Sequence, residues 1–323
     1  MQFLRTPNQC FEDLPGYPFA PHYVDIRSNT RTAMHMHYVD EGPRDAAPVL
    51  MVHGQPTWSY LYRKMIVPLA AAGHRTIAPD LMGFGRSDKP VEKTEYSFER
   101  HIDWLEELVT KLNLREITLV AQDWGGPIGL GLLARQPDRF ACVVAANTML
   151  HTCDPDLAGR VAWSNYGVGD EDICISEGLL NWIAYSQRAP KIDASMPVGA
   201  STVRKIDAAT LAAYDAPFPD ERYKGGLRQF PILIPITRSD PGAGINRATW
   251  KALSEFDRPF LTAFGDSDPG TAGWDTIFQE RVPGAKNQSH TTVNNAGHFI
   301  QEDAGEELAA IVVKFIRRAR GSK

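Results

Sequence analysis

The feature of this chain that most restricts its fold is a regular alternation of short apolar runs with longer amphipathic runs. The run 97–114 places five apolar residues on one helical face: Phe98, Ile102, Leu105, Leu108 and Leu112. The strands expected in the first half are 37–40, 48–54, 75–80, 117–122 and 141–148, and the helices expected there are 59–73, 97–114 and 129–136. Alternation of this kind predicts an α/β fold whose mainly parallel sheet carries helices on both faces.

The alternation stops near residue 150 and resumes after residue 245. The intervening segment contains short helical pieces, prolines and aromatic residues, which favours a mostly helical insertion. After it, the expected strands are 259–266 and 290–295, and the expected helices are 249–256, 275–282 and 305–320. We therefore expect a core domain of residues 1–150 and 246–323, and a helical cap domain of residues 151–245. Such a cap would cover the carboxyl ends of the strands, where open α/β sheets place their sites.

The composition is that of a globular protein and excludes several classes of partner. Hydrophobic residues make up 43% of the 323 residues, which is enough for a sizeable core. The formal charge is −5 and no basic stripe occurs, so we expect no nucleic-acid partner. No run of about 18 apolar residues predicts a membrane span, and the first residues lack the apolar centre of a signal peptide. The cysteines, Cys10, Cys142, Cys153 and Cys174, form no CxxC pair, so we expect reduced thiols and a cytoplasmic location.

A carboxylate stands at a tight turn within the segment AQDWGG, residues 121–126. The segment follows an apolar run and precedes a helical run, so Asp123 lies at a strand-to-helix turn flanked by small residues. A turn of this kind can present one side chain at the edge of the sheet, as the nucleophile elbow of α/β-hydrolases does, usually with serine. The alternative is that Asp123 only caps the following helix, because aspartate is a favoured N-cap residue.

Two further segments supply partners for a nucleophile at this turn. HGQPTWSYLYR (53–63) follows a strand after which this fold needs an oxyanion donor, so the backbone N–H groups of Gln55 and Trp124 are the expected donors. His298, in NAGHFIQED (295–303), follows the last expected strand, which gives the required order of nucleophile first and histidine last. The alternatives are an ordinary strand–loop–helix turn and a surface histidine.

An acid that could orient the histidine occurs in AFGDSDPG, residues 263–270. A carboxylate here would hold the imidazole in the right tautomer and stabilise its charged form. Asp266 and Asp268 both qualify, and the other one would then be a turn residue.

Taken together, these segments resemble the haloalkane dehalogenases of the α/β-hydrolase superfamily, in the branch whose acid follows the strand after the cap. The resemblance runs through nearly the whole chain, in RTPNQCFEDLPGYPFAPHY, HYVDEGPRD, HGQPTWSYLYRKM, APDLMGFGRSDKP, LVAQDWGGPIGL, YDAPFPDERYKGGLRQFP and AGHFIQE. It implies an α/β-hydrolase fold with an inserted helical cap. It also implies hydrolysis of haloalkanes to an alcohol and a halide, without a metal or an organic cofactor.

The resemblance also indicates which acid is used. In the family's pattern the acid is the last residue of a G-x-x-D loop, which points to Asp268, and the stretch AANTMLH before the cap holds no carboxylate that could replace it.

The sequence departs from the family's pattern at two places. Gln55 occupies a position where the family usually has Asn or Glu, which keeps the backbone donor and leaves the role of the side chain open. The cap segment APKIDASMPVG is longer than usual, which leaves the substrate range open.

A carboxylate nucleophile suits attack on a saturated carbon. Asp123 would displace the halide and form an alkyl ester, and His298, oriented by Asp268, would deprotonate the water that hydrolyses this ester. The indole N–H of Trp124 is a donor without an acceptor role, which suits a departing halide. We therefore expect a small halogenated hydrocarbon, water and a halide product as partners of a monomer or weak homo-oligomer.

Two other functions are compatible with parts of this pattern. An epoxide hydrolase would use the same Asp-His-Asp machinery, but its leaving alkoxide needs acids such as the tyrosines of the cap segment, which are Tyr166, Tyr185, Tyr214 and Tyr223. A hydrolase fold that only binds a ligand often lacks one catalytic residue, whereas this chain keeps nucleophile, base and acid. Both alternatives therefore rank below dehalogenation.

The resemblance implies a second halide donor from a cap tryptophan. Two are available, Trp163 in RVAWSNYG and Trp182 in EGLLNWIAYSQ. The position of Trp182 along the cap favours it, with Trp163 as the alternative, although a tryptophan often only fills a core.

Overall fold

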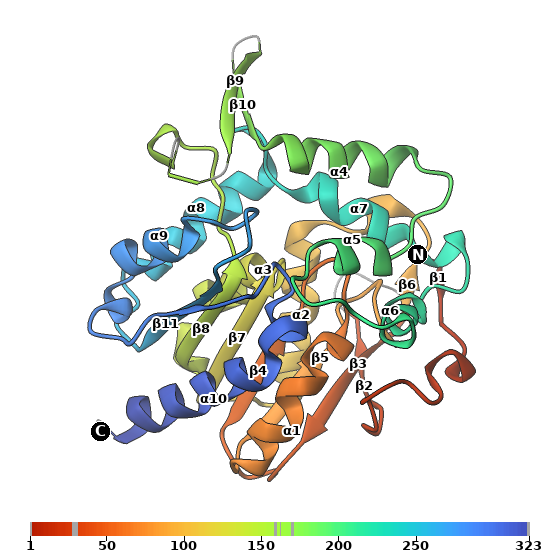
Figure 1. The fold of residues 1–323 in the computed structure, drawn as a ribbon, viewed down its shortest axis with the longest axis horizontal. Coiled ribbons are helices and arrows are strands. Elements are labelled where there is room, and N and C mark those ends of the chain that lie inside the picture. Colours follow the sequence, from red (N-terminus) through yellow and green to blue (C-terminus); the bar gives the residue numbers. More distant parts are fainter. Residues whose placement is uncertain (1, 28–31, 158–159, 162, 169–170, 322–323) are drawn as a thin grey trace.

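The computed structural model describes residues 2–27, 32–157, 160–161, 163–168 and 171–321. Within these ranges the centre of the molecule is an eight-stranded sheet with the order β12-β11-β8-β7-β4-β5-β3-β2 (Figure 1). The strands are β2 His22–Ile26, β3 Met34–Glu41, β4 Pro48–Val52, β5 Arg75–Pro79, β7 Ile117–Asp123, β8 Phe140–Thr148, β11 Phe260–Gly265 and β12 Thr291–Val293. The pairs β2–β3 and β3–β5 are antiparallel and the others are parallel, which confirms the mainly parallel sheet predicted from the sequence.

Helices cover both faces of the sheet. Helices α1 (Arg63–Ala71) and α10 (Ile300–Gly321) pack together on one face, and α2 (Phe98–Lys111), α3 (Gly125–Arg135) and α8 (Pro241–Leu253) pack on the other. Helix α9 (Trp274–Arg281) packs against β11. None of the helices in the described ranges is both long enough and apolar enough to span a bilayer.

The sequence of α2 shows why these helices form where they do. The hydroxyl of Ser97 accepts a hydrogen bond from the backbone N–H of Arg100 at 3.2 Å, which satisfies one of the free donors of the first turn. Four of the five apolar residues predicted to share a face are buried, and the fifth, Leu112, is partly buried at the end of the helix. Burial of this face holds α2 against the sheet.

The inserted segment forms a layer of short helices at one end of the sheet (Figure 1). Its helices are α4 Glu177–Arg188, α5 Ser195–Ala200, α6 Ala208–Asp215 and α7 Gly225–Leu233. A hairpin of β9 (Ser164–Val168) and β10 (Glu171–Ile175) precedes α4, although the sequence predicted helical pieces here. Each hairpin strand has five residues, too short for its period to be distinguished from that of a helical turn. We propose residues 151–245 as the cap domain over a core of residues 1–150 and 246–323, with α8 crossing the boundary.

The remaining elements are short. Strands β1 (Phe3–Leu4) and β6 (Lys89–Pro90) form a separate antiparallel pair. The single-turn 3-10 helices are η1 Asn8–Phe11, η2 Ser59–Tyr62, η3 Lys93–Glu95, η4 Pro137–Arg139, η5 Pro155–Leu157, η6 Glu221–Tyr223 and η7 Pro283–Ala285.

Candidate active site

The turn that carries Asp123 is sterically restricted on every side. Asp123 ends β7 with a φ of 50°, a left-handed conformation that is unusual for a residue other than glycine. A Cβ atom on Gly54 would lie 2.0 Å from the Asp123 Oδ1 atom. A Cβ on Gly126 would lie 1.8 Å from the hydroxyl of Thr148, and one on Gly125 would lie 1.9 Å from a carbonyl of β4. The small residues around Asp123 are therefore required for the exposed turn, as the elbow interpretation predicts.

The two carboxylate oxygens of Asp123 face different partners. Oδ1 accepts a hydrogen bond from the backbone N–H of Gln55 at 2.6 Å. Oδ2 lies 3.4 Å from Nε2 of His298. The main-chain carbonyl of Asp123 accepts a bond from the hydroxyl of Thr148 at 2.6 Å. The carboxylate bonds to the loop after β4 and faces the histidine, so its role extends beyond the alternative of a helix cap.

His298 lies between two carboxylates. Its Nδ1 atom is 3.0 Å from Oδ2 of Asp268, on the side of the ring away from Asp123. Asp268 also accepts bonds from the backbone N–H of Gly270 at 2.9 Å and the hydroxyl of Thr271 at 2.5 Å. The side chain of His298 is 20% exposed and that of Asp268 only 3%. The arrangement fixes the imidazole with one nitrogen on the acid and the other on Asp123.

Asp266, the competing acid, does not contact the histidine. Its carboxylate is exposed and accepts bonds from the hydroxyl of Ser267 at 2.8 Å and the backbone N–H of Ala296 at 3.3 Å. These contacts make Asp266 a residue of the loop, as expected for the aspartate of this pair that is not the acid.

The electrostatics of His298 follow from its neighbours. Burial alone would lower the pKa of the imidazole, but the carboxylates of Asp268 and Asp123 outweigh this effect and raise it to about 10. Burial likewise opposes ionisation of Asp268, yet His298 and the hydrogen bonds from Thr271 and Gly270 lower the pKa of this carboxyl. The two neighbouring carboxylates therefore favour the protonated imidazole.

Two polar residues that the sequence analysis did not select also hold His298. The amide of Gln122 donates to the main-chain carbonyl of His298 at 3.0 Å and lies 3.2 Å from its Nε2. The amide of Asn147 donates to the carbonyl of Gly297 at 2.7 Å and accepts from the N–H of Gly265 at 2.8 Å. Both residues are buried at the carboxyl ends of neighbouring strands. Because open α/β sheets place their sites at these ends, this position is the feature of the sequence that could have identified them as site residues.

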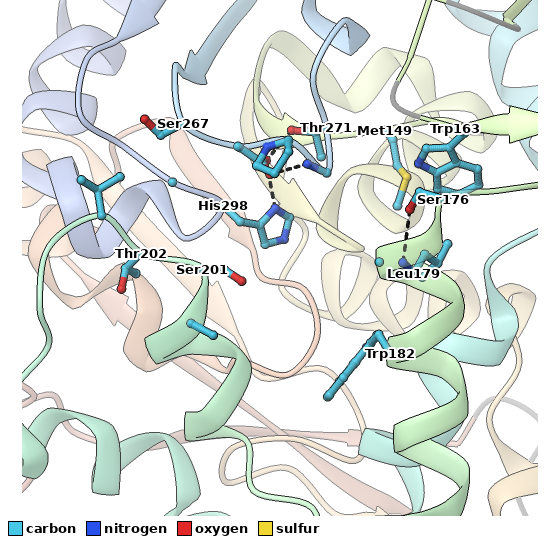
Figure 2. A pocket seen from close by; sticks show the side chains of 17 residues that line it. Met149, Trp163, Ser176, Leu179, Trp182, Ser201, Thr202, Ser267, Thr271 and His298 are labelled. Carbon is cyan, nitrogen blue, oxygen red and sulfur yellow. Dashed lines mark hydrogen bonds and ion pairs between the residues drawn. The ribbon is translucent and has the colours of Figure 1, made fainter.

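Two cavities lie beside the catalytic candidates His298 and Asp123. The main cavity, of about 590 Å³, is lined by His298, Asp268 and residues of α4 and the loop after α5. In Figure 2, Trp163 and Trp182 lie on one side of this cavity, with His298 and Ser201 on the other. The inner cavity, of about 10 Å³, is lined by Asp123, Trp124, His151 and other residues, and Met149 lines both cavities. A space of this size accommodates about one water-sized particle.

The three candidate tryptophans differ in their hydrogen bonding. Trp124 and Trp163 are both buried, and neither indole N–H has an acceptor among the residues that the structure describes. The ring centroid of Trp163 lies 4.0 Å from that of His151, with the two rings tilted by 58°, and His151 lines the inner cavity. The indole N–H of Trp182 donates instead to Oε1 of Gln55 at 3.3 Å.

The fold and this geometry define a class. The site of an α/β-hydrolase has a nucleophile at a strand end, a histidine after the last strand, and an acid that orients the histidine. Asp123 stands at such a strand end and accepts a backbone N–H bond, His298 follows the last strand, and Asp268 follows the strand before it. The family model for the alpha/beta hydrolase fold matches residues 47–172.

Similarity to known proteins identifies the family. A haloalkane dehalogenase of Psychrobacter cryohalolentis is 51% identical over 316 residues, which cover 98% of each chain. One from Mycobacterium marinum is 44% identical over 98% of this chain and 100% of its own. The solved structure of a tetrameric haloalkane dehalogenase, DpaA from Paraglaciecola agarilytica, has a TM-score of 0.84 and 33% identity, covering 96% of this chain and 97% of its own. The chain belongs to the haloalkane dehalogenase family.

Proposed function

We propose that the protein hydrolyses haloalkanes to an alcohol and a halide ion through an ester on Asp123. The observation that carries this proposal is that the two oxygens of the Asp123 carboxylate have different partners. Oδ1 accepts the Gln55 N–H at 2.6 Å, and Oδ2 lies 3.4 Å from Nε2 of His298. Membership of the family supports the same reaction.

The first step is a displacement at carbon. Oδ2 of Asp123 attacks the carbon that bears the halogen, the carbon–halogen bond breaks, and the halide leaves with the bonding electrons. The product is an alkyl ester of Asp123. The N–H of the Trp124 indole, which lines the inner cavity with Asp123, donates to the departing halide.

The second step regenerates the carboxylate. His298 takes a proton from water as this water attacks Cγ of the ester, and charge develops on Oδ1, where the N–H groups of Gln55 and Trp124 stabilise it. The intermediate then collapses, the bond between Cγ and Oδ2 breaks, and the alkoxide takes the proton from His298 to give the alcohol. The carboxyl group left on Asp123 still carries the second proton of the water, and its release to solvent regenerates the carboxylate. Asp268 orients the ring throughout.

Alkylation also prepares the base for this second step. The ester removes the negative charge of Asp123, which is one of the two charges that raise the pKa of His298 to about 10 in the free protein. The pKa of the imidazole therefore falls when the ester forms. The amide of Gln122, 3.2 Å from Nε2, also favours the neutral ring. His298 becomes a base at the stage when a base is needed.

The contacts of the cap tryptophans support Trp163 as the second halide donor, with Trp182 as the alternative. This order reverses the one predicted from the sequence. The N–H of Trp163 has no acceptor among the described residues, and its ring packs on His151 beside the inner cavity. The N–H of Trp182 already has Gln55 as its acceptor, so a halide would have to displace that bond.

The epoxide hydrolase alternative is less well supported. Its leaving alkoxide needs a proton donor, but no tyrosine lines either cavity within the described part of the chain. Tyr214 donates its hydroxyl to Glu302, and the hydroxyl of Tyr185 lies on the outside of the cap. Tyr223 packs against the core, and the side chain of Tyr166 lies outside the described residues.

A substrate panel tests the proposed function. Purified protein is mixed with chloro-, bromo- and iodoalkanes and, separately, with terminal epoxides, and halide, alcohol and diol are measured. We expect one halide and one alcohol per haloalkane, with no diol above the level of the control, and Asp123→Ala should abolish the reaction. Diol formation without halide release would favour the epoxide hydrolase, and tight ligand binding without any product would favour a binding protein.

We propose two further properties of the chain. The four cysteines form no CxxC pair in the sequence, which supports a reducing location such as the cytoplasm. We also propose a monomer or weak homo-oligomer in solution, which light scattering at several protein concentrations checks.

A further inference from the structure

Gln55 is bonded to the core and to the cap at the same time. Its backbone N–H donates to Oδ1 of Asp123 at 2.6 Å. Its side-chain amide donates to the main-chain carbonyl of Leu227 at 3.1 Å, and its Oε1 atom accepts from the indole N–H of Trp182 at 3.3 Å. We call these two side-chain bonds the clasp.

The clasp connects the loop after β4 to two different cap helices. Trp182 lies on α4 and Leu227 near the start of α7, and these helices pack against each other. Gln55 itself is buried, and so is its bond to Leu227, whereas the bond to Trp182 is partly buried. Breaking them would leave a buried amide without partners, which is costly, so the loop has a strong preference for this one position.

The position of the loop matters because the Gln55 N–H acts in opposite directions in the two proposed steps. In the displacement, Asp123 loses negative charge, so a donor on Oδ1 stabilises the starting carboxylate more than the transition state. In ester hydrolysis, Oδ1 gains negative charge, so the same donor stabilises the transition state. A closely held N–H therefore slows alkylation slightly and accelerates hydrolysis.

We propose that the Gln55 side chain is a positioning group: by clasping Trp182 and Leu227 it holds the Gln55 N–H on Asp123 and so favours hydrolysis of the alkyl-enzyme. This inference rests on the proposed function. It assigns a role to the glutamine that departs from the family's usual residues, and it assigns the Trp182 indole to the loop instead of to the halide.

Single-turnover kinetics can separate this role from a general loss of structure. The protein, in molar excess over 1-bromobutane, is mixed with it and quenched at intervals, and mass spectrometry follows formation and decay of the alkyl-enzyme. Gln55→Met keeps the length of the side chain and removes both clasp bonds. Trp182→Phe leaves Gln55 intact and removes one of them. Tyr185→Phe, on the same helix, removes the hydroxyl that donates to the Lys191 carbonyl and is the matched control.

We expect Gln55→Met and Trp182→Phe to slow hydrolysis of the alkyl-enzyme by about 5- to 10-fold, the loss of one to two neutral hydrogen bonds. Alkylation should stay the same or become faster. The two changes combined should slow hydrolysis no more than Gln55→Met alone, because both act through the same bond. Tyr185→Phe should leave both steps unchanged, and bromide affinity should be unaltered in Trp182→Phe.

Other outcomes overturn the proposal. If both steps slow together, the clasp acts only on stability, and if neither changes in Trp182→Phe, the bond has no role in positioning. Should Gln55→Met fail to fold, Trp182→Phe decides the question by itself. If wild-type protein forms no alkyl-enzyme while releasing halide, the ester mechanism has failed instead, and that result is visible before any variant is made.

Discussion

Two of the histidine–aspartate contacts in the described residues, both made through Nδ1, have similar geometry in very different surroundings. His37 Nδ1 lies 2.7 Å from Asp80 Oδ2, and His298 Nδ1 lies 3.0 Å from Asp268 Oδ2. The side chains of His37 and Asp80 are 1% and 0% exposed, whereas His298 is 20% exposed and lines the main cavity. The other nitrogen of His298 lies 3.4 Å from Asp123.

The surroundings of the acids explain the contrast. Asp80 also accepts bonds from the backbone N–H groups of Ser59 and Arg86, both at 2.7 Å, so it holds a loop together. Burial opposes its ionisation, but His37 and these donors lower the pKa of Asp80 to about 2. A histidine–aspartate pair is thus not in itself a site. We propose that such a pair acts as a base only where its second ring nitrogen faces a cavity and a further carboxylate, as that of His298 does.

The largest expected effect on turnover comes from breaking the pair of His298 and Asp268. His298→Gln should still allow attack by Asp123 but not hydrolysis, because only the second step needs an activated water. We expect turnover to fall by roughly 10²–10⁴-fold, the usual contribution of a general base. Alkyl-enzyme should accumulate, and mass spectrometry after mixing with a bromoalkane would detect it.

The same substitution in the buried pair is the control. His37→Gln should lower the free energy of unfolding by on the order of 1 kcal/mol, the contribution of one hydrogen bond, and leave turnover within about twofold of the wild type. A variant of His298 that turns over normally, or a variant of His37 that accumulates the ester, would reverse the roles assigned to the two pairs.

A smaller loss of turnover is expected when Asp268, the acid that orients His298 in the proposed mechanism, is replaced. Asp268→Asn removes the charge that supports the imidazolium, and we expect turnover to fall by about 100-fold, the lower end of the contribution of a general base. Asp266→Asn changes only the exposed loop carboxylate and should cost less than about twofold. Steady-state halide release measures both variants. Equal losses would mean that the contact at 3.0 Å between His298 and Asp268 does not orient the base.

Smaller still is the expected effect on halide binding. Trp163→Phe removes an N–H that has no acceptor among the described residues, while keeping most of the ring. The loss of a charge-assisted donor should weaken bromide binding by about 1.5–3 kcal/mol. Fluorescence quenching by bromide measures this directly, and Trp182→Phe is the matched variant. A large loss in Trp182→Phe with none in Trp163→Phe would restore the order predicted from the sequence.

The last prediction concerns stability as a function of pH and not turnover or binding. The pKa of His298 is raised from 6.5 to about 10 on folding, so its protonation stabilises the folded state. This contribution is complete below about pH 6.5 and is lost as the pH rises towards 10. The melting temperature of the wild type should therefore exceed that of His298→Gln most near pH 6, with a gap that narrows towards pH 10. A gap that stays constant in calorimetry would show that the imidazole is not charged in the free protein.

Much of this arrangement could be predicted from local sequence. The elbow was visible because Asp123 follows a buried run and stands among glycines, and α2 was visible because its apolar residues repeat with a helical period. The choice of Asp268 over Asp266 came from resemblance to a family, since both residues suit a turn. The structure adds the contact that separates them.

What could not be predicted depends on contacts between distant segments. The bond between Gln55 and Trp182 joins residues that are 127 positions apart, and no local pattern encodes it. The amide of Gln122 reaches His298 across 176 positions. Local sequence also could not distinguish the two cap tryptophans, because both indoles would pack and only the acceptor of each N–H differs.

The elbow has a consequence for how the protein could diversify. The backbone and its glycines, together with the left-handed conformation at position 123, expose whatever side chain stands there. The backbone that places a side chain at position 123 is therefore independent of which side chain stands there. Under the proposed function, exchange of Asp123 alone would alter the attacking group while the glycines of the turn and the contact of His298 with Asp268 stay unchanged.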